Sequence, residues 1–327
     1  MRGRKPDSAR IEARLDGLRQ AKWIGLARQW WPKYVFRFDD IQNAVRILQC
    51  GRVLCRAKRG EALETASQAV LDHTEERWKN HVRLYFRPRT PTQYQVEGFR
   101  PKGQFGSLQA HMPVPVFFLF DAKDILTRAS TKFSDGNLAA HAVGVGENAD
   151  YFEAIPFEKV YHDSWMSEGE KANIKFHRHA EVVVPDELDL DSLRLIWLRT
   201  EAEYKTLLHL LPPVAVRKYG SKMRHGKKPN LHFCSWSFVE SASLEQNKIS
   251  LVFNVSTLTP GPFAAHLDVR NRATGEGYKW ENPQFQAKGT LTVGVPQIKK
   301  AAAFDVRFTL DGAVAYADRF TPKTISF

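Results

Sequence analysis

The chain has 327 residues, 43% hydrophobic and 26% charged, a composition typical of a folded globular protein that excludes a largely disordered chain. Its formal net charge of +12 favours a polyanionic partner, most simply nucleic acid, over a basic surface without a specific partner. The sequence shows neither a secretory signal nor an apolar run of about 18 residues that would cross a membrane, so we expect a cytoplasmic protein without a membrane partner. The three cysteines have no metal-ligand spacing and are expected to be free thiols.

The N-terminal part predicts a helix, a strand and a second helix. Apolar residues recur at helix spacing within residues 1–33, which indicates a helical extension. Residues 34–38 (YVFRF) form a short apolar segment that predicts a strand. A helix follows, with Asp39 or Asp40 as its N-cap and Gly51 as its C-cap, because a short acidic side chain accepts from free helix N–H groups and glycine readily adopts the left-handed backbone at a helix end.

The middle of the chain alternates between apolar and basic segments. Residues 61–81 are expected to be helical or loop, and residues 82–96 to be a strand interrupted by two prolines, with arginines and aromatic residues interleaved. This mixture suits single-stranded nucleic acid, where cations follow phosphates and rings stack on bases, although an edge strand with solvated arginines is the competing interpretation. Residues 114–121 predict a buried strand, residues 131–142 a turn leading into a helix, and residues 152–165 a helical connector.

A cluster of basic and imidazole side chains precedes Glu181 in the segment KFHRHAEVVV, residues 175–184. The three valines after Glu181 favour a buried strand, where a carboxylate must find partners or change its pKa. One interpretation is a carboxylate neutralised by its basic neighbours, and the other is a catalytic glutamate on a core strand.

The C-terminal third differs in pattern from the rest of the chain. Residues 193–199 predict a strand, residues 201–211 an amphipathic helix, and residues 214–219 a further short strand. Residues 218–230 are rich in Lys, Arg and Gly and are interpreted as a basic linker. Residues 231–327 contain period-two runs separated by turn residues, which indicate an antiparallel β-sandwich.

Four segments, in order, resemble the DarT family of nucleic-acid ADP-ribosyltransferases. They are FRFDDIQNAVRILQCGRVL, LYFRPRTPTQYQV, FFLFDA with FSDGNLA, and KFHRHAEVVVPD. The resemblance covers roughly residues 34–220 and implies an ADP-ribosyltransferase-like mixed α/β domain, placed at residues 34–222. With the all-β sandwich-like domain that the period-two pattern predicts at residues 231–327, the expected fold class is α+β. The segment 1–33 would then be an N-terminal extension.

The resemblance also implies a function. A family member would use NAD to modify a base in single-stranded nucleic acid, which is DNA by resemblance and RNA as the alternative. It would act as a toxin in a toxin–antitoxin or phage-defence system, together with a cognate antitoxin, typically one that contains a macrodomain. For the C-terminal sandwich, which the resemblance does not cover, we expect a role in binding a partner or positioning the substrate.

The resemblance assigns catalysis to Glu181, since a carboxylate near the ribose stabilises positive charge at the anomeric carbon and can remove a proton from the acceptor. Arg89 and Arg77 are candidates to clamp the NAD diphosphate or the acceptor base, because guanidinium groups make bidentate contacts. The residues expected to bind NAD are Arg37, Asp39, Asn43, Tyr85 and Tyr94, with packing in the core as the alternative for the two tyrosines. The residues expected to contact nucleic acid are Arg87, Lys79, His177, Arg178 and His179, with solvated charges as the alternative for Arg87 and Lys79. No ligand set completes a metal site, so no metal is expected.

The first segment departs from the family pattern. Arg37 stands where the family has a histidine that helps to hold NAD, and Asp39 and Asp40 stand where it has threonine and histidine, while Asn43 matches. These changes favour a rival hypothesis, a nucleic-acid-binding protein that kept the fold and lost NAD turnover. A transferase that modifies proteins is a further alternative, which the basic charge disfavours.

Overall fold

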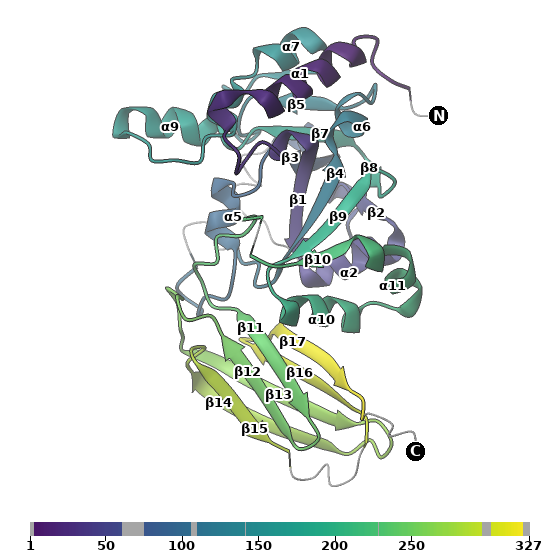
Figure 1. The fold of residues 1–327 in the computed structure, drawn as a ribbon, viewed down its shortest axis with the longest axis vertical. Helices are drawn as coiled ribbons and strands as arrows, with labels where there is room; N and C mark the ends of the chain where they lie inside the picture. Colours follow the sequence, from purple (N-terminus) through teal and green to yellow (C-terminus); the bar gives the residue numbers. More distant parts are fainter. Residues whose placement is uncertain are drawn as a thin grey trace.

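The structure is a computed structural model that describes residues 3–60, 75–105, 110–140, 142–227, 229–295 and 302–322. It contains a large sheet surrounded by helices in the N-terminal two thirds of the chain and two smaller sheets in the C-terminal third (Figure 1). The predicted α+β class is therefore confirmed. Within the described ranges, no helix combines the length and apolar character needed to cross a lipid bilayer.

The large sheet has eight strands, and each pairs antiparallel with its neighbour except the edge pair β10 and β9, which is parallel. In sheet order the strands are β10 (Met223–His225), β9 (Leu193–Leu198), β4 (Pro115–Asp121), β1 (Tyr34–Asp40), β3 (His81–Tyr85), β7 (Glu181–Pro185), β5 (Lys132–Ser134) and β6 (Val145–Gly146). Strand β4 is the continuous apolar run expected of a strand covered on both faces, and six of its seven residues are buried. A separate two-stranded sheet joins β2 (Arg52–Leu54) to β8 (Glu187–Asp189).

The helices form two main groups around this sheet (Figure 1). The first contains α1 (Ser8–Gln20), which contacts α6 (Ala122–Leu126) and α7 (Ala149–Ala154), and the second contains α2 (Ile41–Cys50), which contacts α10 (Glu201–Leu210) and α11 (Pro213–Tyr219). Shorter helices are α4 (Glu76–Lys79), α5 (Pro91–Val96) and α8 (Phe157–Val160), and α9 (Glu168–His177) precedes β7. Four 3₁₀ turns are η1 (Lys22–Ile24), η2 (Trp31–Lys33), η3 (Arg56–Lys58) and η4 (Gly220–Lys222).

The predicted strand and helix at the start of the sheet are confirmed. The Asp40 side chain caps α2 by accepting from the Gln42 N–H at 2.9 Å. Gly51 ends the helix in the left-handed region, with φ of 72°, which an L side chain adopts only at a cost. The N-terminal helix α1 is also confirmed and buries Ile11 and Leu15 against the core.

Three predicted elements differ from the structure. Residues 91–96 are the helix α5 and not the end of a strand, because Thr90 caps it and Pro91 occupies its first turn, where a missing N–H costs nothing. Residues 214–219 belong to helix α11, which begins in the same way at Pro213, and not to a strand. Residues 131–140 form β5 and turns and no helix, in part because the Asn137 side chain accepts from the Ala139 N–H and so competes with helix formation. The predicted segment 61–74 lies outside the described residues.

The C-terminal third forms the predicted sandwich of two antiparallel sheets. One sheet contains β11 (Val239–Glu245), β12 (Lys248–Phe253) and β15 (Thr290–Gly294), and the other contains β14 (Gly277–Phe285), β13 (Phe263–Asn271), β16 (Phe304–Leu310) and β17 (Ala313–Phe320). The rings of Phe253, Phe285 and Phe308 lie 5.4–6.1 Å apart and join the two sheets. Alternate residues of β13 and β16 are buried, as period-two patterning requires.

A buried ion cluster connects the large sheet to the sandwich. Arg199 follows β9 and pairs with Glu203 on α10 and, at 3.6 Å, with Glu97, and all three side chains have at most 1% exposure. Glu97 in turn accepts from the backbone N–H groups of Phe233 (3.1 Å) and Cys234 (2.9 Å), which lead into the sandwich. The Arg199 guanidinium also lies 4.1 Å from the centre of the Phe238 ring. This buried guanidinium is therefore one of the groups that hold the sandwich against the large sheet, together with hydrogen bonds such as that from Thr200 Oγ1 to the Val239 carbonyl.

We predict that Arg199→Leu destabilises the protein by about 3–5 kcal/mol, because it leaves two buried carboxylates without their cation. Arg194→Leu is the matched control, since Arg194 lies on β9 just before Arg199, is 57% exposed and pairs with Asp121, so its loss costs about 1 kcal/mol or less. Urea unfolding of both variants measures the difference. Equal losses for the two variants would contradict the role assigned to Arg199.

Candidate active site

Glu181 is the first residue of β7 and lies directly opposite Tyr85 on β3. Its side chain is 1% exposed, and the three valines that follow it belong to the apolar core. The carboxylate accepts from both Nε and Nη2 of Arg83 and from the Leu138 backbone N–H at 3.3 Å. These charge-assisted bonds offset the cost of burying the carboxylate and fix its orientation.

Arg83 was not predicted as a site residue. It lies on β3, two residues before Tyr85, so its side chain shares a face of the sheet with Tyr85 and Glu181. Although burial opposes it, the Glu181 carboxylate raises the pKa of Arg83 and keeps the guanidinium charged. The alternation in VRLYF indicates that Arg83 and Tyr85 share a face, but only the pairing of β3 with β7 brings Arg83 to Glu181.

The predicted NAD-binding residues of β1 and α2 form a second ion cluster. Asp39 is buried and accepts from Arg37 Nη2 at 2.5 Å, from Arg59 Nη2 at 2.8 Å and from the Asn43 amide at 2.8 Å. Two guanidinium groups therefore share one carboxylate, and the set has a net charge of about +1. Although burial opposes it, the two arginines hold the pKa of Asp39 below its usual value.

The Asp39 cluster and the Arg83–Glu181 pair meet at β3. Arg37 Nη1 donates to the backbone carbonyl of Arg83 at 3.2 Å, so a continuous path of polar contacts runs from Asp39 on β1 to Glu181 on β7. The structure thus brings together three of the predicted NAD-binding residues and the predicted catalytic glutamate. Arg37 Nε is buried and has no hydrogen-bond partner within the described part of the chain.

The two predicted tyrosines lie in different surroundings. Tyr85 is cross-strand to Glu181, stacks on Phe38 with ring centres 5.6 Å apart, and shares a hydrogen bond with Thr92. Burial raises the pKa of Tyr85 to about 12, so its hydroxyl stays protonated at neutral pH. Tyr94 lies on α5, is 43% exposed, and packs against rings that come from outside the large sheet.

The position of Arg87 contradicts the prediction that it contacts nucleic acid. Its side chain is fully buried and donates to the carbonyls of Pro88, Val160 and His162. It also pairs with Asp163 at 2.6 Å. With its donors directed into the core, Arg87 holds the chain after β3 and cannot reach a phosphate.

The other predicted arginines occupy two places. Arg89 and Arg178 both face Asp163, at 3.6 and 3.5 Å, and Arg178 also donates to the Arg89 carbonyl at 3.3 Å. Arg77 lies on the short helix α4, is 66% exposed and pairs with Glu75 at 2.7 Å. Its neighbour Lys79 pairs with Glu76 at 2.7 Å. No contact among the described residues joins Arg77 or Lys79 to Glu181, and their roles stay predictions.

The two predicted histidines use one ring nitrogen each within the protein. His177 Nδ1 donates to the Asp135 carbonyl at 2.6 Å, and His179 Nδ1 donates to the Lys175 carbonyl at 2.9 Å. Burial lowers the pKa of His179, so its ring is neutral at pH 7 and would contact nucleic acid as a neutral donor or acceptor. Among the described residues, no three His, Cys, Asp or Glu side chains are arranged to hold a metal ion.

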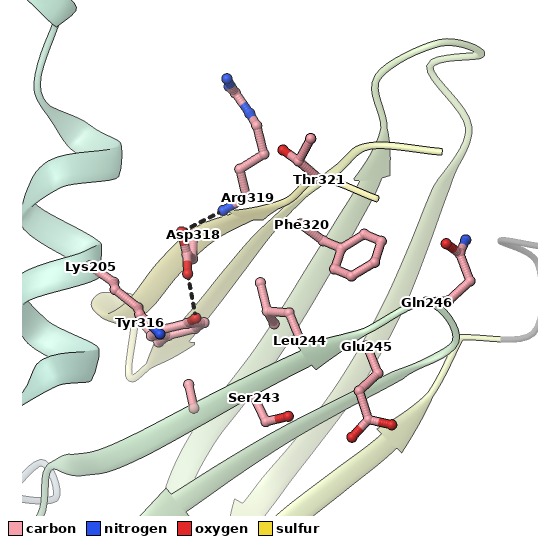
Figure 2. A pocket seen from close by; sticks show the side chains of 11 residues that line it. Lys205, Ser243, Leu244, Glu245, Gln246, Tyr316, Asp318, Arg319, Phe320 and Thr321 are labelled. Carbon is pink, nitrogen blue, oxygen red and sulfur yellow. Dashed lines mark hydrogen bonds between the residues drawn. The ribbon is translucent and has the colours of Figure 1, made fainter. Parts of the chain in front are cut away.

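A separate hollow of about 700 Å³ lies between β11 and β17 of the sandwich (Figure 2). Apolar Leu244 and Phe320 and charged Lys205 and Arg319 line it, and Tyr316 donates to Asp318 at 2.9 Å beside it. None of the residues predicted to carry the chemistry lines this hollow. The path from Asp39 to Glu181 is therefore the candidate active site.

A family model described as "ssDNA thymidine ADP-ribosyltransferase, DarT" matches residues 36–230, which include Asp39, Arg83 and Glu181. The chain belongs to the DarT family. The predicted family and the predicted enzyme class, ADP-ribosyltransferase, are confirmed.

Several solved structures are similar to the DarT-like part. Thermus sp. 2.9 DarT in complex with ADP-ribosylated ssDNA has 13% identity and a TM-score of 0.49, over 62% of this chain and 97% of that chain. The same protein in complex with NAD+ has 13% identity and a TM-score of 0.45, over 60% and 93%. Thermosipho africanus DarTG in complex with ADP-ribose has 16% identity and a TM-score of 0.45, over 69% and 56%. A comparison with curated proteins finds no match.

Asp40 leads to a prediction about pH. It is buried beside Asp39, and burial raises the pKa of Asp40 from 3.8 to about 7. The folded state then binds more protons than the unfolded state between about pH 4 and pH 7, so the free energy of unfolding falls as the pH rises through this window, by an amount on the order of 4 kcal/mol. Asp40→Asn keeps a good N-cap and removes this loss.

Urea unfolding of the wild type and Asp40→Asn at several pH values measures this effect. The variant should gain stability relative to the wild type as the pH rises from about 4 to about 7. Parallel curves across this range would show instead that Asp40 is an ordinary ionised cap in the folded state.

Proposed function

We propose that this DarT family member transfers ADP-ribose from NAD to a thymidine base in single-stranded DNA, and that Glu181 is its catalytic carboxylate. The observation that carries the assignment is the burial and bidentate fixation of Glu181 at the start of a core strand, inside the matched region. The family description names the base and the acceptor. Single-stranded RNA is the alternative acceptor, and it would present a base to Glu181 in the same way.

The ion cluster on β1 suits the NAD diphosphate. Arg37 and Arg59 share the single carboxylate of Asp39 and stay 13% and 19% exposed, so they can add a contact to an anion without losing their partner. The unpartnered Nε of Arg37 is a further donor that a ligand oxygen could satisfy. Arg37 therefore takes the place of the histidine expected from the family pattern, and Asp39 holds it in position.

Glu181 can perform two steps of the reaction. The bond between the ribose and the nicotinamide nitrogen breaks, its electron pair leaves with nicotinamide, and positive charge develops at the anomeric carbon. A carboxylate fixed near the ribose stabilises that charge. A nitrogen of the acceptor nucleobase then bonds to the anomeric carbon. The proton on that nitrogen passes to a general base, a role that suits the Glu181 carboxylate. Each carboxylate oxygen has more than one lone pair, so Glu181 can accept a hydrogen bond from a ribose hydroxyl while it stays paired with Arg83.

The wider role follows from the product. An ADP-ribose on the base edge blocks base pairing, so we propose that the chain acts in the cytoplasm as a toxin of a toxin–antitoxin or phage-defence system. Its cognate antitoxin would contain a macrodomain that removes the modification. This part of the proposal is supported by family membership.

We predict that Glu181→Gln lowers the rate of transfer by a factor of about 10²–10⁴, because the amide is neutral and cannot accept the proton. Affinity for single-stranded DNA should stay close to that of the wild type, and the variant should no longer arrest growth of a host that expresses it. Glu187→Gln is the matched control and should retain activity. Glu187 lies on β8, the next strand along the chain, and its exposed carboxylate pairs with Arg52. An active and toxic Glu181→Gln variant with a normal melting temperature would contradict the assignment.

A further inference from the structure

A group of rings lies where α5 meets the start of the sandwich. The Tyr94 ring packs edge-on against Phe233 (5.1 Å between centres) and Trp236 (4.8 Å). The Arg89 guanidinium lies 4.8 Å from the Phe233 ring centre, and the Arg100 guanidinium lies 3.9 Å from that of Trp236. We call Tyr94, Phe233 and Trp236 the ring cluster. Phe233 and Trp236 follow the region that the family model matches.

Only one ring of the cluster is strongly exposed. Tyr94 is 43% exposed, whereas Trp236 and Arg100 are each 6% exposed. Arg100 also donates to the Tyr94 carbonyl at 2.5 Å, so the buried pair supports both the backbone and the ring of Tyr94. The Tyr94 ring is thus fixed from two sides while part of it faces solvent. A ring held this way loses little conformational entropy when a planar ligand stacks on it.

The ring cluster is connected to Glu181 through two sets of contacts. Tyr85, opposite Glu181, bonds to Thr92 on α5, two residues before Tyr94. Arg178, three residues before Glu181, donates to the carbonyl of Arg89 at 3.3 Å. The turn between β3 and α5 therefore has the candidate catalytic carboxylate at one end and the ring cluster at the other.

The surroundings of the ring cluster are positively charged. Asp163 is the carboxylate shared by the guanidinium groups of Arg87, Arg89 and Arg178, which leaves a net charge of about +2. Arg89 and Arg178 keep 24% and 13% of their side chains exposed. Arg89 has a φ of 57°, a left-handed conformation that costs energy outside glycine, and its N–H donates to Gln93 Oε1 at 2.8 Å. This strained backbone places the Arg89 side chain between Asp163 and Phe233.

We infer that Tyr94 stacks on a base of the single-stranded DNA substrate that neighbours the modified base, while Arg89 and Arg178 face the adjoining phosphates. Every nucleobase has a π-face, so one exposed ring beside excess positive charge suits a single strand without requiring a particular sequence. The inference rests on the proposed function. It assigns Tyr94 to the nucleic acid and not to NAD, and it gives the residues before the sandwich a part in substrate binding, because Phe233 and Trp236 orient the ring.

Steady-state kinetics with a single-stranded oligonucleotide test this inference. Tyr94→Ala should raise the KM for the oligonucleotide about tenfold and leave the KM for NAD near the wild-type value, since one base stack is lost. Tyr94→Phe should restore the wild-type KM, and Phe233→Leu should raise it by a smaller factor, because the ring is present but less well fixed. Tyr278→Ala, the same change at a partly buried position of β14, is the matched control and should behave as the wild type.

A rise in the KM for NAD, with the KM for the oligonucleotide unchanged, would overturn the inference and place Tyr94 in the NAD pocket. If neither KM changes, the inference is wrong and the ring cluster has only a structural role. Fluorescence anisotropy with the same oligonucleotide separates this failure from failure of the proposed function. If the wild type transfers no ADP-ribose, Tyr94→Ala should still bind the strand about tenfold more weakly than Tyr94→Phe, and equal binding of the two variants would contradict the inference.

Discussion

A carboxylate held inside a β-sheet is the constraint on which the candidate site depends. Glu181 lies among residues that favour a dry interior, where an unpaired charge would be very costly. Arg83 offsets that cost from the adjacent strand, and the two planar groups meet through two hydrogen bonds. This pairing requires β3 and β7 to keep their register, so the geometry of the site and the stability of the sheet centre depend on the same contact.

Charge compensation also links the departures from the family pattern to one another. Arg37 and Asp39 are not independent changes, because Asp39 accepts directly from Arg37 and from Arg59. In the proposed site, guanidinium groups held by a buried carboxylate stand in place of the single histidine of the family pattern. Membership of a family described as an ADP-ribosyltransferase counts against the rival hypothesis that Arg37, Asp39 and Asp40 first suggested.

Local patterns predicted much of the fold, and long-range pairing decided the rest. The cap at Asp40, the end of α2 at Gly51 and the apolar run of β4 depend on neighbouring residues, so they are visible in the sequence. The strand predictions fail at residues 91–96 and 214–219, where a proline in the first turn of each segment favours a helix.

The candidate site was predictable in part for the same reason. Glu181 was identified because a carboxylate before three valines must find a partner and because the segment resembles the family motif. Arg83 has no such signal in the sequence, and only the pairing of β3 with β7 brings it to Glu181. Arg87 and Arg89 are two residues apart, yet one is fully buried and the other partly exposed. Their sequence context does not separate them, because the difference depends on where Asp163 and Phe233 lie in the fold.

Labelled NAD tests the central claim most directly. The protein would be incubated with labelled NAD and one acceptor in each of four reactions. The acceptors are single-stranded DNA, duplex DNA, single-stranded RNA and a protein extract, and the covalent label on each is measured. The account predicts label on single-stranded DNA. Label on RNA alone would keep the chemistry and change the acceptor, and label on protein alone would contradict the nucleic-acid substrate. No label on any acceptor, with NAD intact, would contradict the claim that Glu181 and its arginines form a working transferase site.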